Sequence, residues 1–251
     1  MGIEFVLSLL LVSAGAGSPV LVPAPIKNVY IPMGFDDNDI TQVVVEGSFE
    51  SACYRAGPSH VWKDPLQNRI AFHLEAYYYP EGFCAEVMTP YLEVIDIGEL
   101  SKGVHQIFLR PELQGLELKE VGQMPVAEAL SERRDEYLYA PVDSIAIVEN
   151  SLGRRRDLLV MGTFTNSCMR FNRNIEREKP GFRRVSLTAQ NLLEVLPVLH
   201  DIEDTTNCRD IEEAFVERLS IPQHIQGDRY LFHIRTMSGK SFNKIDRIDH
   251  P

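Results

Sequence analysis

The densest group of possible metal ligands in the sequence is an acidic segment made of Asp36, Asp37, Asn38 and Asp39. Oxygen ligands at closely spaced positions of a tight loop are what Ca²⁺ requires, so the segment is a candidate calcium site. The EF-hand pattern is not met, because the loop lacks its glycine and its final glutamate. Asn and Asp are also ordinary turn residues between two strands, and both interpretations stay open.

A basic group, Arg154, Arg155 and Arg156, lies where a second copy of the same turn is expected. It could bind an anionic ligand, or it could be a solvated turn that protects a sheet edge from pairing. The opposite charges of the two turns also suggest a hypothesis for oligomerisation, in which the acidic turn of one molecule pairs with the basic turn of another.

An aromatic run, Tyr77, Tyr78 and Tyr79, ends at a turn that contains Phe83. Exposed rings on a loop can anchor a protein or glycan partner. Alternation along a strand directs at least one of these rings outward and allows another to point into the core. Trp62 is predicted to lie on the same rim of the molecule as this aromatic loop.

The sequence lacks the motifs of common catalytic sites. It has no GxSxG, HExxH, Walker loop or GxGxxG, and no histidine lies four residues from another. His60, His73 and His105 are expected to be surface or packed residues. We therefore predict a protein that is not an enzyme and that has no cofactor apart from possible Ca²⁺.

An internal repeat supplies the elements that must position these side chains. The pattern V-x-G-[ST]-F-x-x-[AS]-C ends at Cys53 and recurs 115 positions later at Cys168. Cys84 and Cys208 are each followed by an aromatic residue, an isoleucine and a glycine at +7, +13 and +19. Each copy thus owns one cysteine pair, which predicts the disulfides Cys53–Cys84 and Cys168–Cys208. The loop-entropy model gives each about 3–4 kcal/mol.

Alternating apolar and polar residues predict short strands in both copies. They cover 28–33, 41–49, 69–78 and 104–109 in the first copy, and 144–148, 158–164, 183–189 and 228–235 in the second. A short amphipathic helix is possible over 126–138, and residues 191–199 are expected to form a helical turn or a loop flap. The expected fold is all-β, with two tandem antiparallel β-sandwiches, each holding one disulfide.

The N-terminus is typical of a secretory signal peptide. The apolar run from Phe5 to Val12 is too short to span a bilayer, and Ala14-Gly15-Ala16 fits a cleavage site. The first four residues contain no Lys or Arg, which departs from the usual basic start, and a buried N-terminal element is the alternative. The predicted organisation is a signal peptide (1–16), a Pro-rich spacer (17–26), module 1 (27–112), a linker (113–140) and module 2 (141–246).

The composition excludes several classes of protein. The chain has 25 Lys and Arg against 36 Asp and Glu, so its net charge of −11 argues against a general nucleic-acid binder. Its 44% hydrophobic residues can fill a core, which argues against a disordered chain. No second long apolar run follows the N-terminal one, so no stable membrane span is expected in the mature chain.

The Gly-x-Phe-x-x-x-Cys strand, the second cysteine and the glycine-opened last strand resemble tandem immunoglobulin-like β-sandwich modules of exported bacterial proteins. The resemblance covers residues 26–245 and implies architecture alone, because antibody domains have a longer cysteine spacing and a characteristic Trp. We expect an exported, non-enzymatic binding or structural protein of the periplasm or cell surface, with a protein or glycan partner. The alternatives are an enzyme inhibitor or chaperone-like accessory protein, and a hydrolase with a site at the module junction.

Overall fold

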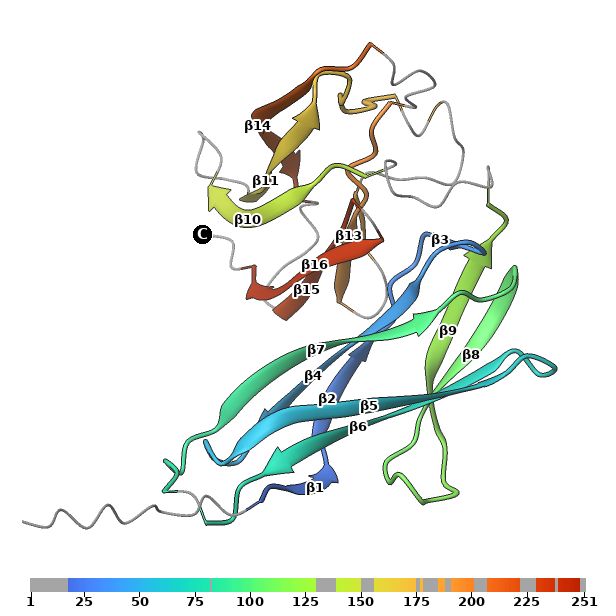
Figure 1. Ribbon diagram of the computed structural model, residues 1–251, viewed down its shortest axis with the longest axis vertical. Coiled ribbons are helices and arrows are strands. Elements are labelled where there is room, and N and C mark those ends of the chain that lie inside the picture. The colour runs from blue at the N-terminus through green and yellow to red at the C-terminus, as the bar shows by residue number, and fades with distance from the viewer. Residues whose placement is uncertain are drawn as a thin grey trace, which may run out of the picture.

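Strands make up all the regular elements in the parts of the chain that the computed structural model describes, which confirms the all-β class. These parts are residues 18–81, 83–129, 139–149, 156–174, 177, 185–187, 191–200, 207–221, 229–237 and 239–248. Within them, no helix is long and apolar enough to cross a membrane. The strands form an N-terminal unit, β1–β9, and a C-terminal unit, β10–β16 (Figure 1).

The N-terminal unit contains two sheets. The smaller sheet has the order β2 (Ile26–Tyr30), β4 (Thr41–Phe49), β7 (Thr89–Gly98). The larger sheet has the order β1 (Val20–Pro23), β6 (Arg69–Tyr78), β8 (Gly103–Leu109), β9 (Lys119–Ala127), β3 (Phe35–Asp36), and β5 (Tyr54–Asp64) also pairs with β6. Buried side chains from both sheets, such as Val43, Val45, Phe72 and Ile107, form one core between them.

The C-terminal unit also contains two sheets. One has the order β10 (Val142–Glu149), β11 (Arg156–Asn166), β14 (Asp210–Ser220). The other has the order β12 (Val185–Leu187), β13 (Leu192–Val195), β15 (Arg229–Thr236), β16 (Lys240–Arg247). Its core contains, among others, Val160, Phe164, Leu193 and Phe232.

The two units share one strand topology, as the sequence repeat implies. Strand pairing equates β2, β4 and β7 with β10, β11 and β14, and equates β5, β6, β8 and β9 with β12, β13, β15 and β16. The expectation of purely antiparallel sheets is wrong, because β6 runs parallel to β8 and β13 runs parallel to β15. Each parallel pair is joined through a strand of the opposite sheet, so no hairpin constrains its direction.

The glycine of the repeat motif sits at the same close contact in both units. A Cβ on Gly47 would overlap the Pro25 carbonyl oxygen and the Tyr91 ring, and a Cβ on Gly162 would overlap the Pro141 carbonyl oxygen and the Phe215 ring. The motif phenylalanine two residues later stacks on the same ring, with centroids 4.4 Å apart for Phe49 and Tyr91. The second copy repeats this stacking at 4.5 Å. The motif therefore needs glycine for close packing.

Two left-handed asparagines mark equivalent positions before the parallel strands. Asn68 precedes β6 with a φ of 50°, and Asn191 precedes β13 with a φ of 54°. Their carbonyl oxygens accept hydrogen bonds from the amides of Gln106, at 2.8 Å, and Leu231, at 3.0 Å. Apart from glycine, asparagine is among the residues that tolerate this conformation best. The chain therefore turns at the same point in both units, just before the parallel pairing begins.

Both predicted disulfides are present. Cys53 bonds to Cys84 with their Cα atoms 5.2 Å apart, and Cys168 bonds to Cys208 with their Cα atoms 5.5 Å apart. Each closes a loop within one unit, so each unit carries its own cross-link between its two sheets' connecting segments.

Two local predictions are wrong. Val126 and Ala127, where the helix was to begin, belong to β9, which pairs with β8, and the rest of that segment lies largely outside the described residues. Residues 192–195, expected to form a helical turn or flap, are strand β13. All four of its side chains are buried, because one face joins the core and the other faces the N-terminal unit.

The units pack sheet against sheet through their outward faces. Tyr30 and Val44 of the N-terminal unit join Leu192 and Leu231 of the C-terminal unit in one buried cluster. The outward faces of β2 and β4 thus cover those of β13, β15 and β16, and we call this contact the interdomain interface (Figure 1). It explains why β4 is buried on both faces.

Candidate functional site

The acidic segment lies at the interdomain interface. Asp39 is 3% exposed, and its Oδ1 accepts a hydrogen bond from Nη2 of Arg235 at 3.0 Å. Its Oδ2 accepts from the amide of Asp36 at 3.0 Å, and Oδ1 of Asp37 accepts from the amide of Ala129 at 2.9 Å. Burial and the nearby Asp39 carboxylate raise the pKa of Asp36 above its ordinary value.

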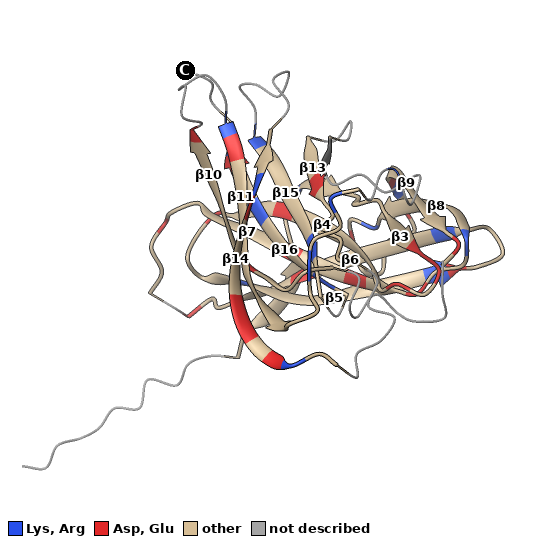
Figure 2. Ribbon diagram, turned by 90° about the horizontal axis from the view of Figure 1, so that it is seen from above, with Lys and Arg blue, Asp and Glu red and all other residues tan. Residues whose placement is uncertain are grey.

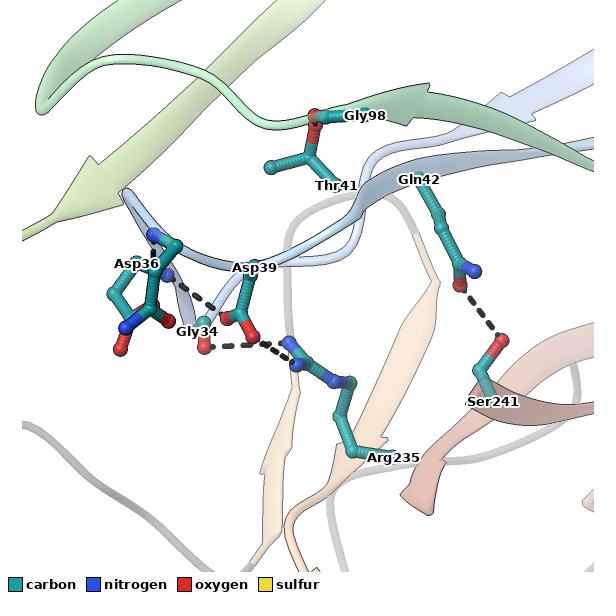
Figure 3. A network of polar contacts seen from close by, with 9 residues as sticks. Gly34, Asp36, Asp39, Thr41, Gln42, Gly98, Arg235 and Ser241 are labelled. Carbon is teal, nitrogen blue, oxygen red and sulfur yellow. Dashed lines mark hydrogen bonds and ion pairs between the residues drawn. The ribbon is translucent and has the colours of Figure 1, made fainter. Parts of the chain in front are cut away.

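Arg235 makes this segment an internal clasp. The side chain is 1% exposed, and its guanidinium lies 4.5 Å from the Phe35 ring centroid and 4.8 Å from that of Tyr139. A second nitrogen approaches the Gly34 carbonyl oxygen at 3.5 Å (Figure 3). The guanidinium thus supplies the positive charge beside Asp39 that a calcium ion would supply. Among the described residues, no group of three or more His, Cys, Asp or Glu is placed so that it could hold a metal ion.

A second ion pair crosses the interface at Glu46. Its Oε1 lies 2.7 Å from Nη2 of Arg229. Its Oε2 accepts hydrogen bonds from Nδ2 of Asn28 at 2.8 Å and from the hydroxyl of Tyr30 at 3.1 Å. Burial and the adjacent Glu46 raise the pKa of Tyr30 to about 12, so its hydroxyl remains a donor at neutral pH.

A chain of neutral hydrogen bonds lies between the two ion pairs. Oγ of Ser241 donates to Oε1 of Gln42 at 2.9 Å (Figure 3). Nδ2 of Asn243 donates to Ser241 at 2.8 Å. Nδ1 of His233 donates to Oδ1 of Asn243 at 2.7 Å. Burial lowers the pKa of His233 to about 4, so the imidazole is neutral at neutral pH. Of these bonds, the one between Gln42 and Ser241 crosses the interface, and the other two hold Ser241 and His233 in place within the C-terminal unit.

The predicted aromatic loop divides into a packed part and an exposed part. Tyr78 stacks on Tyr54 at 4.8 Å, and Tyr54 stacks on Phe49 at 5.6 Å, so these rings continue the aromatic packing of the core. Tyr77 is half-buried on β6, whereas Tyr79 is 38% exposed and Phe83 is fully exposed.

Further exposed apolar side chains come from β1, which pairs with the end of β6 that carries Tyr77 and Tyr78, and from the segment after Cys84. We call this group of side chains the aromatic end. It consists of Val20, Leu21, Tyr79, Phe83, Val87 and Met88. Backbone hydrogen bonds from Tyr79 to Cys53 and from Ala52 to Ala85 hold its base beside the disulfide.

Trp62 does not lie on this rim. It pairs with Ala71 on the neighbouring strand, six residues along β6 from Tyr77, or about 20 Å. The guanidinium of Arg110 lies 4.1 Å from its ring centroid. Arg110 occupies the repeat position of Arg235, because each lies four residues after the amide that bonds to a left-handed asparagine. At this position, Arg235 of the C-terminal unit pairs with Asp39 across the interface, whereas Arg110 of the N-terminal unit packs on the ring of Trp62.

The histidines of the first copy are packed by internal partners, as expected. His60 donates from Nε2 to the Glu75 carboxylate at 2.9 Å. Nδ1 of His73 donates to the Arg110 carbonyl oxygen at 2.8 Å, and Nε2 of His105 donates to that of Ser101 at 2.7 Å.

The basic turn is described only at its end. Arg154 and Arg155 lie outside the described residues, and Arg156 begins β11, where its guanidinium lies 3.3 Å from Glu149. The oligomerisation hypothesis pairs this basic turn with the acidic turn of another molecule. Asp39 of the acidic turn is buried against Arg235, so it is not exposed for that contact. Exposed acids instead gather on β14, an outer strand of its sheet, where Asp210, Glu212 and Glu213 discourage edge-to-edge pairing (Figure 2).

A cavity of about 620 Å³ opens at the junction of the two units. It runs along β2 and is bounded by β9 on one side and by Asn191 and Arg229 of the C-terminal unit. Glu46 and Tyr30 reach into it, but the oxygens of Glu46 are held by three donors. These oxygens are therefore engaged in structure.

Sequence reasoning missed the residues of the interdomain interface, although β4 carried a signal for them. Gln42 and Glu46 flank Val44 in a strand whose alternate residues, Val43 and Val45, are core. Polar residues are tolerated at such a buried strand only where partners from a second packed face satisfy them.

No protein-family model, curated protein or solved structure matches this chain.

Proposed function

We propose that the chain is an exported, non-enzymatic binding protein of the cell envelope, built from two immunoglobulin-like sandwich modules, and that the aromatic end is its recognition surface. The observation that carries the proposal is Phe83, whose ring is fully exposed next to a disulfide. Large apolar side chains that gather on a surface mark contact sites, whereas singly scattered ones are ordinary.

The base of the aromatic end is rigid, which favours binding. The disulfide ties Cys84, next to Phe83, to Cys53, and the stacked rings of Phe49, Tyr54 and Tyr78 pack at the ends of β4, β5 and β6 nearby. A rigid site loses less conformational entropy on association than a flexible loop does. Aromatic anchors of this kind commonly carry a large share of binding energy.

Two features support export. Disulfides form and persist in oxidising compartments, and both cysteine pairs are bonded. The first strand, β1, begins at Val20, so cleavage after Ala16 would leave every described residue in the mature chain.

The junction cavity gives little support to the hydrolase alternative. A general base needs a carboxylate or imidazole that can accept a proton from substrate. The carboxylate of Glu46 already accepts from three groups, and the raised pKa of Tyr30 keeps its hydroxyl protonated. Glu120 on the exposed rim is the remaining carboxylate among the described lining residues, and no histidine is among them. A binding role fits this arrangement better.

Retention on envelope material tests the proposal. The purified mature chain would be applied to an envelope fraction of its native host, and the bound fraction compared between the Phe83→Ser/Tyr79→Ser double variant and wild type. We expect the double variant to bind with an affinity at least about 10-fold lower than that of wild type. This factor corresponds to about 1.4 kcal/mol of binding free energy, the contribution of one aromatic anchor. Leu66→Ser and Leu116→Ser are matched controls, because these leucines are 96% and 97% exposed elsewhere.

The same assay identifies the class of partner. Protease treatment of the envelope should abolish retention if the partner is a protein, whereas enzymatic removal of glycans should abolish it if the partner is a glycan. Equal retention of the double variant and of both leucine variants would refute the aromatic end as the recognition surface.

A further inference from the structure

The junction cavity lies along an edge strand. Within the described residues, β2 pairs with β4 on one side, and all five of its residues line the cavity on the other. A strand edge presents backbone donors and acceptors at regular spacing, and an extended peptide can pair with it. Five residues correspond to about 16 Å of strand.

The floor of the cavity is apolar. Ile26, Val29, Leu109 and Val121 are half-buried and pack against the core of the N-terminal unit. These side chains therefore line a side of the sandwich where the cavity leaves the edge of the core partly exposed. Alternate side chains of a strand laid beside β2 would reach this floor.

The rim of the cavity is mainly basic. Lys27 and Lys119 are exposed on opposite sides, with Glu120 as the one exposed acid among the described lining residues. Arg229 and Glu46 neutralise each other at 2.7 Å. The rim thus carries excess positive charge on a chain whose net charge is −11, which favours an acidic ligand.

The second copy of the module differs at this place. In the C-terminal unit β10, the equivalent of β2, lies against β16. The hydroxyl of Thr236, the last residue of β15, also holds the start of β10 by accepting from the amide of Val142 at 2.8 Å and donating to the Ala140 carbonyl oxygen at 3.1 Å. The fold therefore closes this side in one copy, and the N-terminal unit holds a cavity at the same position.

We propose that the cavity is a binding groove for an extended acidic peptide of a partner protein, which pairs with the free edge of β2. Apolar side chains of the peptide enter the floor, and its carboxylates contact Lys27 and Lys119. This groove is separate from the aromatic end, so it is a second site and does not depend on the proposed role of Phe83.

Fluorescence anisotropy with defined peptides tests this proposal. The probe is a labelled eight-residue peptide of alternating valine and glutamate with blocked ends. The first comparison peptide has lysine in place of glutamate, and the second has alternate backbone nitrogens methylated, which removes donors and keeps the side chains. We expect saturable binding of the valine–glutamate peptide and affinities at least about 10-fold lower for both comparison peptides.

Variants of the chain locate the site. Lys27→Glu/Lys119→Glu should weaken the valine–glutamate peptide at least about 10-fold and should improve binding of the valine–lysine peptide. Lys240→Glu, an exposed cation on β16, and Phe83→Ser should leave both affinities unchanged. The proposal is overturned if the probe does not bind, if methylation has no effect, or if Lys27→Glu/Lys119→Glu binds like wild type.

Discussion

The ion pair between Asp39 and Arg235 should hold the interdomain interface together, and Asp39→Asn is the sharpest perturbation of it. Asparagine keeps the shape of the side chain and an oxygen that accepts from the amide of Asp36. It removes the negative charge beside a guanidinium that is 1% exposed. The amide nitrogen then faces the guanidinium, so the ion pair and its hydrogen bond are lost while the shape of the side chain is kept.

The expected magnitude follows from the geometry. At 3.0 Å and an effective dielectric constant of 20, two unit charges attract by about 5–6 kcal/mol, part of which offsets their desolvation. Removing one partner leaves the other charge buried and uncompensated, so Asp39→Asn and Arg235→Met should each lower the unfolding free energy by about 3–5 kcal/mol. The double variant should lose at least about 2 kcal/mol less than the sum.

Equilibrium unfolding in urea measures these differences. Fluorescence of Trp62, the single tryptophan, follows the N-terminal unit, and far-UV circular dichroism follows both units. Asp246→Asn is the matched control, because its pair with Lys244 has a similar distance of 3.1 Å but is exposed and should contribute less than about 1 kcal/mol. Losses as small as this control, or additive losses in the double variant, would refute the clasp.

Three further predictions concern stability. The pKa of His233 is about 4 when folded and 6.5 when unfolded, so the unfolded chain binds the extra proton as pH falls through this window. The unfolding free energy should drop by about 3 kcal/mol between pH 6.5 and 4, and His233→Gln should flatten that slope; an unchanged slope would contradict the assignment. Gly47→Ala and Gly162→Ala should each cost about 1–3 kcal/mol or more in urea unfolding, whereas Ser48→Ala should be nearly neutral; unaffected glycine variants would contradict the close contacts. Cys168→Ser/Cys208→Ser should lose about 4 kcal/mol by the loop-entropy relation, and wild-type stability in that variant would count against it.

Local patterns and the repeat predicted much of the first unit. Strands 41–49 and 69–78 have the predicted bounds, and both disulfide pairings followed from the repeat alone. Strand β5 was missed because Gly57 and Pro58 are typical of turns, and here they lie at a shift of register between Ala56 and Ser59.

The interface could not be predicted, because its pairs join residues that are far apart in sequence. Asp39 and Arg235 are 196 positions apart, and the local acidic pattern around Asp39 suggested a cation without indicating which one. Strand β13 has no period of two, since both of its faces are buried, and periodicity alone cannot identify such a strand. The one local signal at this strand that matches the first copy is Asn191, which precedes β13 as Asn68 precedes β6.

The intact mass of the chain recovered from its native host tests the proposal of an exported, disulfide-bonded protein most directly. We predict a mature chain that begins at Gly17 and lacks the thiol hydrogens of both cysteine pairs. A chain that retains residues 1–16, or one that carries free thiols at Cys53, Cys84, Cys168 and Cys208, would contradict export and remove the basis for a partner in the envelope.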